Sequence, residues 1–432
     1  MASLRIGIAP LTDETGGGAY QYSHSMLGVL ADLRKGREEE LFVLADDLRP
    51  GDPLLGGTAW EIAPLTPQTR QGRALWLAKR LVRDRLSLRQ RELIGRLRSR
   101  REGAAPGVGA PRRRDDVRRW LEQLGIGLVV YPSVTPIAFE SGIPYVLAVH
   151  DLQHRRYPDL PEFGGDEIPE REYLFGNGIA NATLVLVDSE IGKEDVLDFY
   201  GDLIAPDRVA VLPFLPGVAP TVTQEDRERV RRVHRLPERY LFYPAQLWPH
   251  KNHRLIVEAL AELERTDGIA AELVLVGSKL GPIREQCYTE LVARARELGV
   301  EGRIRFLGYV PAEDMPALYA EAVALAMPTL FGPTNIPVLE AWALDCPVIT
   351  SDIRGVREQA GDAALLVDPE SPDAMADAIR RVWREEDLRA ELAARGRARL
   401  ALYTRDDYAA RLEAILDQAV ALVGNPRERV GV

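Results

Sequence analysis

A loop between two apolar segments combines a possible anion site with a carboxylate. The apolar run Val323–Met327 is expected to form a buried strand, as is Pro347–Thr350. Between them lie the loop Gly332–Pro337 and a short helix that carries Glu340 about one turn from its start. Backbone N–H groups at a helix N-terminus bind anions, and a carboxylate can accept hydrogen bonds from a vicinal diol. A nucleotide sugar offers a diphosphate and a ribose diol; the alternative is an ordinary strand–helix turn with a solvated glutamate.

A lysine follows the first expected strand of the second half, Tyr240–Tyr243, in the sequence YPAQLWPHKNH. Lys251 is expected to begin a helix, where its ammonium group can neutralise a diphosphate both in the substrate and as it departs. Gln246 and Asn252 lie in the same loop, together with a tryptophan and a histidine. This crowding favours a binding site over the alternative of an isolated surface lysine.

Two further strand ends in the second half offer contacts to a nucleotide. Gly277 ends the expected strand Leu273–Gly277, and the Ser-Lys pair after it could meet phosphate. Tyr309 follows the expected strand Ile304–Leu307, and the backbone around it could frame a nucleobase. In the loop before Glu340, we expect the donor contacts to come from Thr334, Asn335 and Ile336.

Two strand ends in the first half carry weaker signals. Gly17 and Gly18 belong to a glycine run that follows the first expected strand. Glycines let a phosphate or sugar approach backbone N–H groups, although a plain flexible turn explains the run equally well. Asp188 and Ser189 end another expected strand and can simply cap the helix that follows.

His150 and Asp151 end the expected strand Tyr145–His150. A histidine at this position can donate a hydrogen bond to a sugar hydroxyl or a phosphate; the alternative is a buried histidine that is satisfied within the core. Arg155 and Arg156 follow closely, which favours a site for the acceptor or the transferred sugar.

Strands alternate with helices throughout the chain, which predicts an α/β protein with parallel sheets covered by helices on both faces. Two sets of about six strands predict two doubly wound, Rossmann-like domains. The proline-rich segment 212–223 marks a boundary, so we expect an N-terminal acceptor-binding domain at 1–217, a donor-binding domain at 218–403 and a C-terminal helix and tail at 404–432. Open parallel sheets bind ligands at the carboxyl ends of their strands, and we expect two such domains to face each other across a central cleft. The remaining expected strands are Leu4–Ala9, Leu41–Ala45, Leu128–Tyr131, Leu184–Asp188, Val209–Leu212, Ala324–Met327, Val348–Thr350 and Leu365–Val367.

The composition limits the class of protein and its compartment. No run of about 18 apolar residues predicts a membrane-spanning helix, and the N-terminus lacks the pattern of a signal peptide. The two cysteines, Cys287 and Cys346, fit a reducing compartment and exclude a cysteine-based zinc site. No Asp-x-Asp follows an apolar strand, so we expect neither a metal nor another cofactor. These features predict a cytoplasmic protein.

Positive charge is concentrated in one segment. The formal net charge is −10, yet Arg70–Arg119 holds 17 Lys and Arg against 5 Asp and Glu. We expect a basic helical insertion at about residues 70–119, in which apolar residues recur at partly helical spacing. Such a helix can contact an anionic membrane, which would place the protein peripherally at the inner membrane face. The alternatives are a solvated insertion and, less favoured, nucleic-acid binding, which we do not expect.

With its motifs in this order, the chain resembles the retaining glycosyltransferases of family 4 (glycosyl transferases group 1), which have the GT-B fold. The resemblance covers nearly the full length, and SDIRGVREQAGDAALLVDP is itself close to a family signature. It is most specific across Tyr243–His253, Leu273–Gly277, Arg305–Pro311, Thr329–Ala341 and Pro347–Pro369.

The resemblance implies transfer of a sugar from a nucleotide donor with retention at the anomeric carbon. In relatives, the residues that match Glu340, Lys251 and His150 bind the ribose, the diphosphate and the transferred sugar, and the last helix crosses back to the first domain. The expected mechanism is front-face displacement, in which the departing phosphate accepts the proton of the acceptor. GDP-mannose is the first expected donor, before UDP-glucose and UDP-N-acetylglucosamine. The acceptor would be a glycan or lipid-linked glycan in cell-surface polysaccharide synthesis.

Two positions depart from the family pattern. Gly332 stands where a glutamate commonly touches the sugar hydroxyls, and Gln246 stands where an arginine commonly accompanies Lys251. Sugar contacts would then come from Thr334, Asn335 and backbone N–H groups. These departures leave a second interpretation open, a non-catalytic GT-B partner subunit that binds nucleotide or glycan. A sugar-nucleotide epimerase is a third, weaker alternative.

Overall fold

The computed structural model describes residues 4–13, 17–67, 108–109, 111–164, 167–217 and 221–424. The chain divides into an N-terminal unit, Met1–Pro158, Phe163–Leu215 and Thr404–Val432, and a C-terminal unit, Asp159–Glu162 and Pro216–Tyr403. The boundary expected after residue 217 lies close to the division after Leu215. Most of the basic segment Arg70–Arg119 lies outside the described residues.

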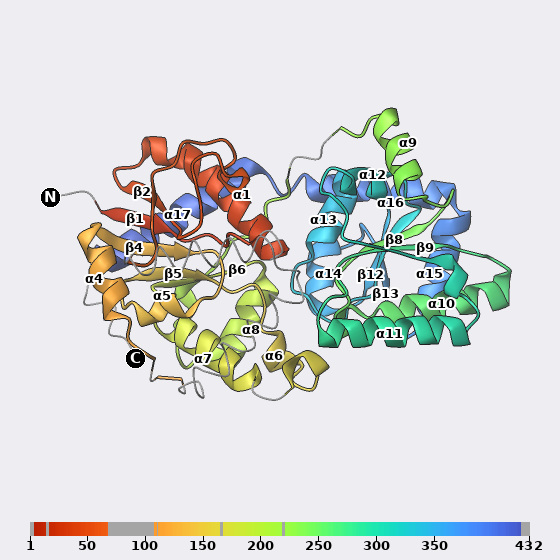
Figure 1. The fold of residues 1–432 in the computed structure, drawn as a ribbon, viewed down its shortest axis with the longest axis horizontal. Helices are drawn as coiled ribbons and strands as arrows, with labels where there is room; N and C mark the ends of the chain where they lie inside the picture. The colour runs from red at the N-terminus through yellow and green to blue at the C-terminus, as the bar shows by residue number, and fades with distance from the viewer. Residues whose placement is uncertain are drawn as a thin grey trace. The chain divides into compact units, whose positions relative to one another are not determined.

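The N-terminal unit contains a seven-stranded parallel sheet in the order β3-β2-β1-β4-β5-β6-β7 (Figure 1). The strands are β1 (Arg5–Ile8), β2 (Glu40–Leu44), β3 (Ile62–Ala63), β4 (Ile126–Tyr131), β5 (Tyr145–Ala148), β6 (Leu184–Val187) and β7 (Val209–Val211). The six expected strands are confirmed, whereas β3 is too short to give a periodic signal. All four residues of β6 are buried, because helices cover both faces of a parallel sheet.

Helices and short 3-10 turns connect these strands. The helices are α1 (Gly18–Leu33), α4 (Asp115–Gln123), α5 (Pro136–Glu140), α6 (Gln153–Arg156), α7 (Glu167–Ala180) and α8 (Glu190–Tyr200). Their apolar faces pack on the sheet: α4, for example, buries Val117 and Leu121, which are four residues apart on one face.

The C-terminal unit contains a six-stranded parallel sheet in the order β10-β9-β8-β11-β12-β13. The strands are β8 (Leu241–Pro244), β9 (Leu273–Val276), β10 (Ile304–Gly308), β11 (Ala324–Met327), β12 (Val348–Ser351) and β13 (Leu365–Val367). The strand order reverses between β8 and β11, which makes their carboxyl ends the topological switch point where open sheets bind ligands. Two doubly wound parallel-sheet domains are thus confirmed.

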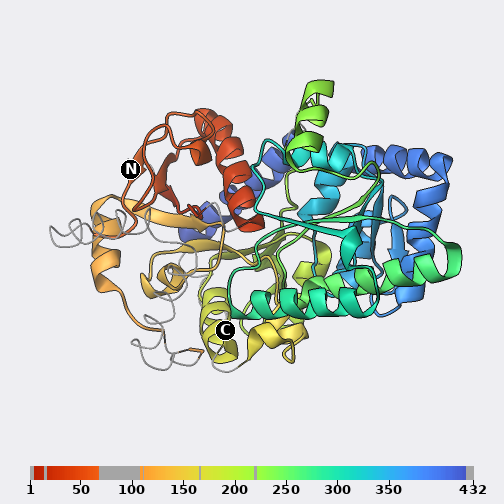
Figure 2. The same ribbon diagram turned by 45° about the vertical axis from the view of Figure 1, so that its right-hand side comes forward.

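Helices cover both faces of this second sheet (Figure 2). Helix α10 packs against α11 and α15, and α13 packs against α12 and α16. The helices are α9 (Gln224–Val233), α10 (His253–Asp267), α11 (Pro282–Glu297), α12 (Met315–Ala320), α13 (Ile336–Ala343), α14 (Arg354–Ala360), α15 (Pro372–Arg384) and α16 (Glu386–Leu400).

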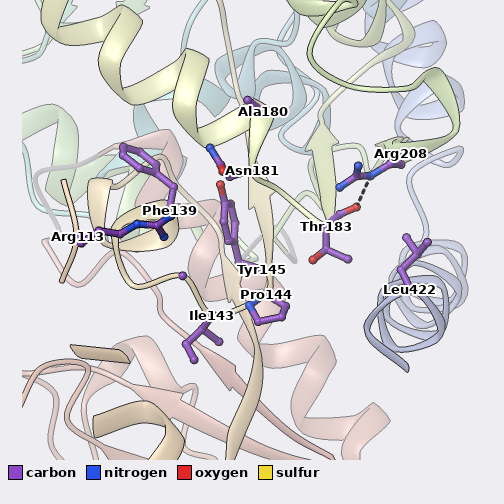
Figure 3. A pocket seen from close by; sticks show the side chains of 11 residues that line it. Arg113, Phe139, Ile143, Pro144, Tyr145, Ala180, Asn181, Thr183, Arg208 and Leu422 are labelled. Atoms are coloured by element: carbon purple, nitrogen blue, oxygen red, sulfur yellow. Dashed lines mark hydrogen bonds between the residues drawn. The ribbon is translucent and has the colours of Figure 1, made fainter. Parts of the chain in front are cut away.

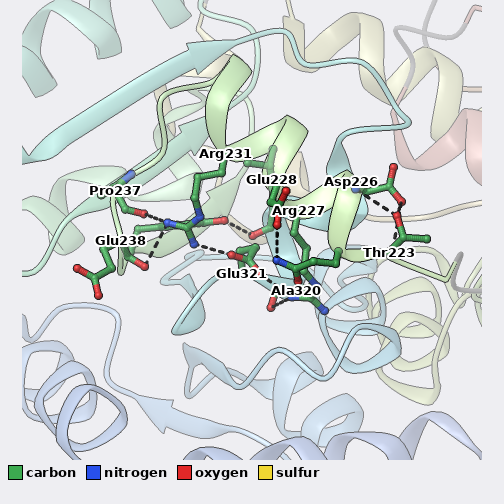
Figure 4. A network of polar contacts seen from close by, with 12 residues as sticks. Thr223, Asp226, Arg227, Glu228, Arg231, Pro237, Glu238, Ala320 and Glu321 are labelled. Carbon is green, nitrogen blue, oxygen red and sulfur yellow. Dashed lines mark hydrogen bonds and ion pairs between the residues drawn. The ribbon is translucent and has the colours of Figure 1, made fainter.

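Helix α9 of the C-terminal unit contacts α12 through ion pairs. It buries only Val230, so apolar burial contributes little to its attachment. Arg227 and Arg231 both pair with Glu321 at the end of α12, as Figure 4 shows. Burial raises the pKa of Glu321, but the two guanidinium groups outweigh burial and leave that pKa below its usual value.

The last helix, α17 (Arg405–Gly424), belongs to the N-terminal unit. Arg405 pairs with Asp32 of α1 at 2.8 Å, and Asp417 accepts from Arg37 at 2.7 Å. Tyr408 and Leu412 are buried on its inner face. The chain therefore returns to its first domain after completing the second, as expected from the sequence.

Candidate functional site

The structure brings together the two loops that carry the strongest sequence signals. Neighbouring strands β8 and β11 end at the same edge of the C-terminal sheet. The loop after β8 leads to Lys251, and the loop after β11 leads to the helix that carries Glu340. The N–H of Leu330 donates to the carbonyl oxygen of His250 at 2.7 Å, and the hydroxyl of Thr329 lies 3.3 Å from the same oxygen. The lysine loop and the loop before α13 are therefore held against each other at this edge of the sheet.

Lys251 does not begin an α-helix, so that expectation is wrong. Pro249–Lys251 forms a short 3-10 helix, and α10 begins at His253. The break lies at Asn252, whose φ of 53° is left-handed and cannot continue a helix. The side-chain amide of Asn252 donates to the carbonyl of Pro369 at 2.8 Å, so this residue anchors the loop after β13 to the lysine loop.

The side chain of Gln246 contacts an arginine that could not be predicted from the sequence. Arg284, on α11, donates to the side-chain oxygen of Gln246 at 2.7 Å, and its guanidinium lies 4.7 Å from the ring centre of Trp248. The indole N–H of Trp248 donates to the same glutamine oxygen at 3.1 Å. Positive charge thus stands beside position 246 although the residue there is neutral. The only sequence signal is an arginine in the first turn of a helix that opens with Gly-Pro.

Gly277 lets the lysine loop cross the end of β9. Its φ is 148°, and a Cβ atom there would lie 2.4 Å from the carbonyl oxygen of Ala245. The role visible in the structure is therefore close backbone approach, and any phosphate contact stays a prediction. Tyr309, after β10, is 83% exposed at the same edge of the sheet.

Glu340 lies in the second turn of α13, where the sequence placed it. One of its carboxylate oxygens accepts the hydroxyl of Tyr319 at 2.6 Å. Burial, with Glu340 adding to it, raises the pKa of Tyr319 far above its usual value. The phenol therefore stays protonated, and its hydrogen bond fixes the orientation of the glutamate.

The loop before α13 is held by tight packing against α14. Gln359 accepts from the backbone N–H of Asn335 and donates to its carbonyl, both at 2.9 Å. A Cβ atom on Gly355 would lie 2.5 Å from the Cα of Pro333. Asn335 is only 4% exposed, and its N–H is already used within the protein. Three residues of this loop are predicted from the sequence to contact the nucleotide-sugar donor. With the N–H of Asn335 already used, the backbone N–H groups of Thr334 and Ile336 remain the candidates for that contact.

Gly332 has a conformation that a glutamate would not adopt readily. Its φ is 147°, and a Cβ atom there would lie 2.8 Å from the side-chain oxygen of Asn335. The departure from the family pattern at this position is therefore built into the fold of the loop.

In the N-terminal unit, His150 is engaged through both ring nitrogens. Nδ1 lies 3.1 Å from a carboxylate oxygen of Asp188, and Nε2 lies 2.8 Å from the carbonyl oxygen of Pro132. Both partners are acceptors, so the arrangement favours the doubly protonated ring. Burial alone lowers the pKa of His150, but the Asp188 carboxylate and the Pro132 carbonyl together raise it. The role of Asp188 is thus pairing with His150, while Ser189 caps α8 through a 3.0 Å bond to the N–H of Gly192.

The other first-half candidates serve the local structure. Arg155 lies 3.5 Å from Glu172, and Arg156 pairs with Asp195. A side-chain oxygen of Asp151 accepts the N–H of Gln153 at 3.1 Å and so starts α6. Gly17, with a φ of 59°, precedes Gly18, the first residue of α1.

The described residues also bear on the expected metal and membrane partners. Among the described residues, no group of three or more His, Cys, Asp or Glu is placed to hold a metal ion. No helix in this part of the chain is both long and apolar enough to cross a bilayer.

Comparisons with known proteins support the resemblance. Residues 224–399 match the family model of the glycosyl transferases group 1. O-antigen chain mannosyltransferase B of Escherichia coli is 27% identical over 256 residues, 59% of this chain and 65% of that protein. D-inositol 3-phosphate glycosyltransferase of Corynebacterium glutamicum is 27% identical over 292 residues, 65% of this chain and 68% of that protein. The chain thus matches about two thirds of the length of these relatives.

Solved structures confirm the fold. Anabaena Alr3699/HepE, in complex with UDP and glucose, aligns with a TM-score of 0.67 at 16% identity, covering 96% of this chain and 99% of that one. WaaG, a glycosyltransferase involved in lipopolysaccharide biosynthesis, aligns with a TM-score of 0.58 at 16% identity, covering 95% and 98%. The fold is GT-B, and residues 224–399 are similar to the glycosyl transferases group 1.

Proposed function

We propose that this chain is a glycosyltransferase that moves a sugar from a nucleotide-sugar donor to a glycan or lipid-linked acceptor. The observation that carries the proposal is the junction at the switch point, where the 2.7 Å bond from Leu330 to the carbonyl of His250 joins the lysine loop to the loop before α13. A lysine and an oriented glutamate at one strand edge suit the two ends of a nucleoside diphosphate. The family match of residues 224–399, which include both side chains, supports this interpretation.

The diphosphate is assigned to Lys251 and Arg284. Lysine and arginine both bind phosphate, and the stacked guanidinium of Arg284 is held in place by Trp248 and Gln246. The N–H groups at Thr334 and Ile336 add partial positive charge at the start of α13. Glu340, oriented by Tyr319, is assigned to accept hydrogen bonds from the ribose hydroxyls. The exposed Tyr309 and its neighbouring backbone are assigned to the base.

The expected reaction retains the anomeric configuration and needs no metal ion. The bond between the anomeric carbon and the leaving phosphate breaks as the acceptor oxygen attacks the same face. The departing phosphate accepts the hydroxyl proton of the acceptor. Lys251 and Arg284 stabilise the charge that develops on the diphosphate, and such preorganised stabilisation is usually the largest single contribution to catalysis. His150 is assigned to a hydroxyl of the transferred sugar, as the resemblance implies.

Mannose is the first candidate for the transferred sugar. The Escherichia coli relative is an O-antigen chain mannosyltransferase, which supports GDP-mannose as donor and a role in cell-surface polysaccharide synthesis. Structural neighbours in complex with UDP and UDP-glucose keep a uridine donor as the alternative. A cytoplasmic location with peripheral membrane contact through Arg70–Arg119 completes the proposal.

A direct assay tests the activity. The purified chain is incubated with GDP-mannose, UDP-glucose and UDP-N-acetylglucosamine in turn, and release of nucleoside diphosphate is measured. Release from one donor above the rate of an enzyme-free control supports the transferase. Thermal stabilisation by a donor without release supports the alternative, a non-catalytic partner subunit, which Gly332 and Gln246 motivate. The absence of both effects for every donor contradicts the proposal.

A further inference from the structure

A pocket in the N-terminal unit is lined by residues that have no assigned role in the reaction. It has a volume of about 300 Å³ and is lined by residues at or just before the starts of β5, β6 and β7 and by the ends of α5 and α7. Arg113, just before α4, and Leu422 of α17 complete the lining. His150 and Asp188 follow β5 and β6, so they stand at the opposite edge of the same sheet. The pocket is therefore separate from the proposed catalytic edge within this unit.

Two arginines give the pocket its charge. Arg113 and Arg208 lie on either side of Tyr145 and Asn181 (Figure 3). Among the residues that the structure describes, neither guanidinium forms an ion pair with a carboxylate. Two positive charges that share one concave surface, and that no described carboxylate neutralises, favour an anionic ligand.

Arg208 is fixed in place before any ligand arrives. Its Nε donates to the carbonyl oxygen of Thr183 at 3.0 Å, and its Nη2 donates to the carbonyl oxygen of Ala182. These bonds satisfy carbonyl groups just beyond the end of α7, and they use only part of the five N–H groups that a guanidinium carries. The remaining donors are preorganised, so little side-chain entropy is lost on binding.

The rest of the lining suits a small ester. Thr183 is 7% exposed and lines the pocket with the amide of Asn181, and both can donate hydrogen bonds. Phe139 and Ile143 add apolar surface. The volume is at the lower end of the range for small-molecule sites, which leaves room for a phosphate and a short body.

We propose that this pocket is a second anion site, which binds the phosphate of a small phosphate ester through Arg113 and Arg208. The same chemistry is offered by a free phosphate ester and by the head group of an anionic lipid. The proposal is independent of the glycosyltransferase assignment, because it uses no residue of the donor site.

The test uses the full-length chain carrying Lys251→Ala, so that the proposed donor site contributes no phosphate binding through its lysine. Glycerol 1-phosphate is titrated by calorimetry against this chain and against variants that add Arg113→Gln or Thr183→Val. Arg118→Gln is the matched control, because it removes the same charge from an exposed arginine that pairs with Glu122 on α4. We expect saturable binding that Arg113→Gln weakens by about tenfold, as for loss of a charge-assisted bond, and that Arg118→Gln leaves unchanged.

A second arm distinguishes the source of the phosphate. The same variants are sedimented with vesicles of phosphatidylglycerol and phosphatidylcholine. Loss of vesicle binding in Arg113→Gln but not in Arg118→Gln, with little binding of free glycerol 1-phosphate, identifies a lipid head group. If neither probe binds in a way that depends on Arg113, the two arginines only support the ends of the helices and the proposal is refuted.

Discussion

Replacing Lys251 with alanine should lower kcat by about 10²- to 10³-fold if the lysine stabilises the leaving diphosphate. The side chain is half-buried on the loop that Leu330 joins to the start of α13. At a separation of about 4 Å and an effective dielectric constant of about 20, two unit charges interact by about 4 kcal/mol. A loss of about 1.4 kcal/mol lowers the rate tenfold, so a stabiliser of this strength accounts for two to three orders of magnitude, approximately.

Lys279→Ala provides the matched control. Lys279 follows the neighbouring strand β9 and belongs to the Ser-Lys pair that the sequence suggested could meet phosphate. In the structure its ammonium group lies 3.8 Å from the ring centre of Tyr288, so it is not assigned to the diphosphate. The Lys279→Ala variant loses the same charge at the same edge of the sheet and should retain most of the activity. The assay is release of nucleoside diphosphate at saturating donor, with thermal melting to verify that both variants fold. Turnover of Lys251→Ala within about threefold of the parent, or equal loss in both variants, would refute the assignment of Lys251.

Three further outcomes are expected. Arg284→Ala should lower kcat/KM by at least about tenfold, and Gln246→Arg in the same chain should restore part of it by returning a cation to the loop; no recovery argues against a shared role. Gly332→Glu should lower the melting temperature and the activity, because of its φ of 147° and the nearby Asn335; a stable, more active variant contradicts this reasoning. Burial lowers the pKa of His253 to about 3, so stability should fall as pH drops below about 6.5, where the unfolded chain binds a proton first. His253→Gln should flatten that dependence in acid melting curves.

Local sequence patterns were sufficient to predict most of the fold. Apolar runs such as LVLV at β6 and β9 identify buried parallel strands, because their burial on both faces leaves no alternation. Polar residues at the ends of those strands then mark the ligand edge through a topological rule. The position of Glu340 on its helix follows from the same local pattern.

The site details depend on contacts between distant residues. Arg284 reaches Gln246 across 38 positions, and Asp188 reaches His150 across the same separation. No periodic pattern in the sequence predicts such pairs, because the residues around each partner indicate only an ordinary position on a helix or at the end of a strand. The occupied N–H of Asn335 likewise depends on Gln359, 24 positions later, so the supply of free donors at α13 could not be judged from the loop alone.

The return of α17 to the first domain has a consequence for biosynthesis. On the ribosome, the strands and helices of the N-terminal unit emerge long before Arg405–Gly424, the segment that packs against α1 and β4. The apolar surface that Tyr408 and Leu412 cover in the folded protein therefore stays exposed while the C-terminal unit is translated. During that interval, the nascent first domain exposes this apolar surface, and the docking of α17 then completes its fold.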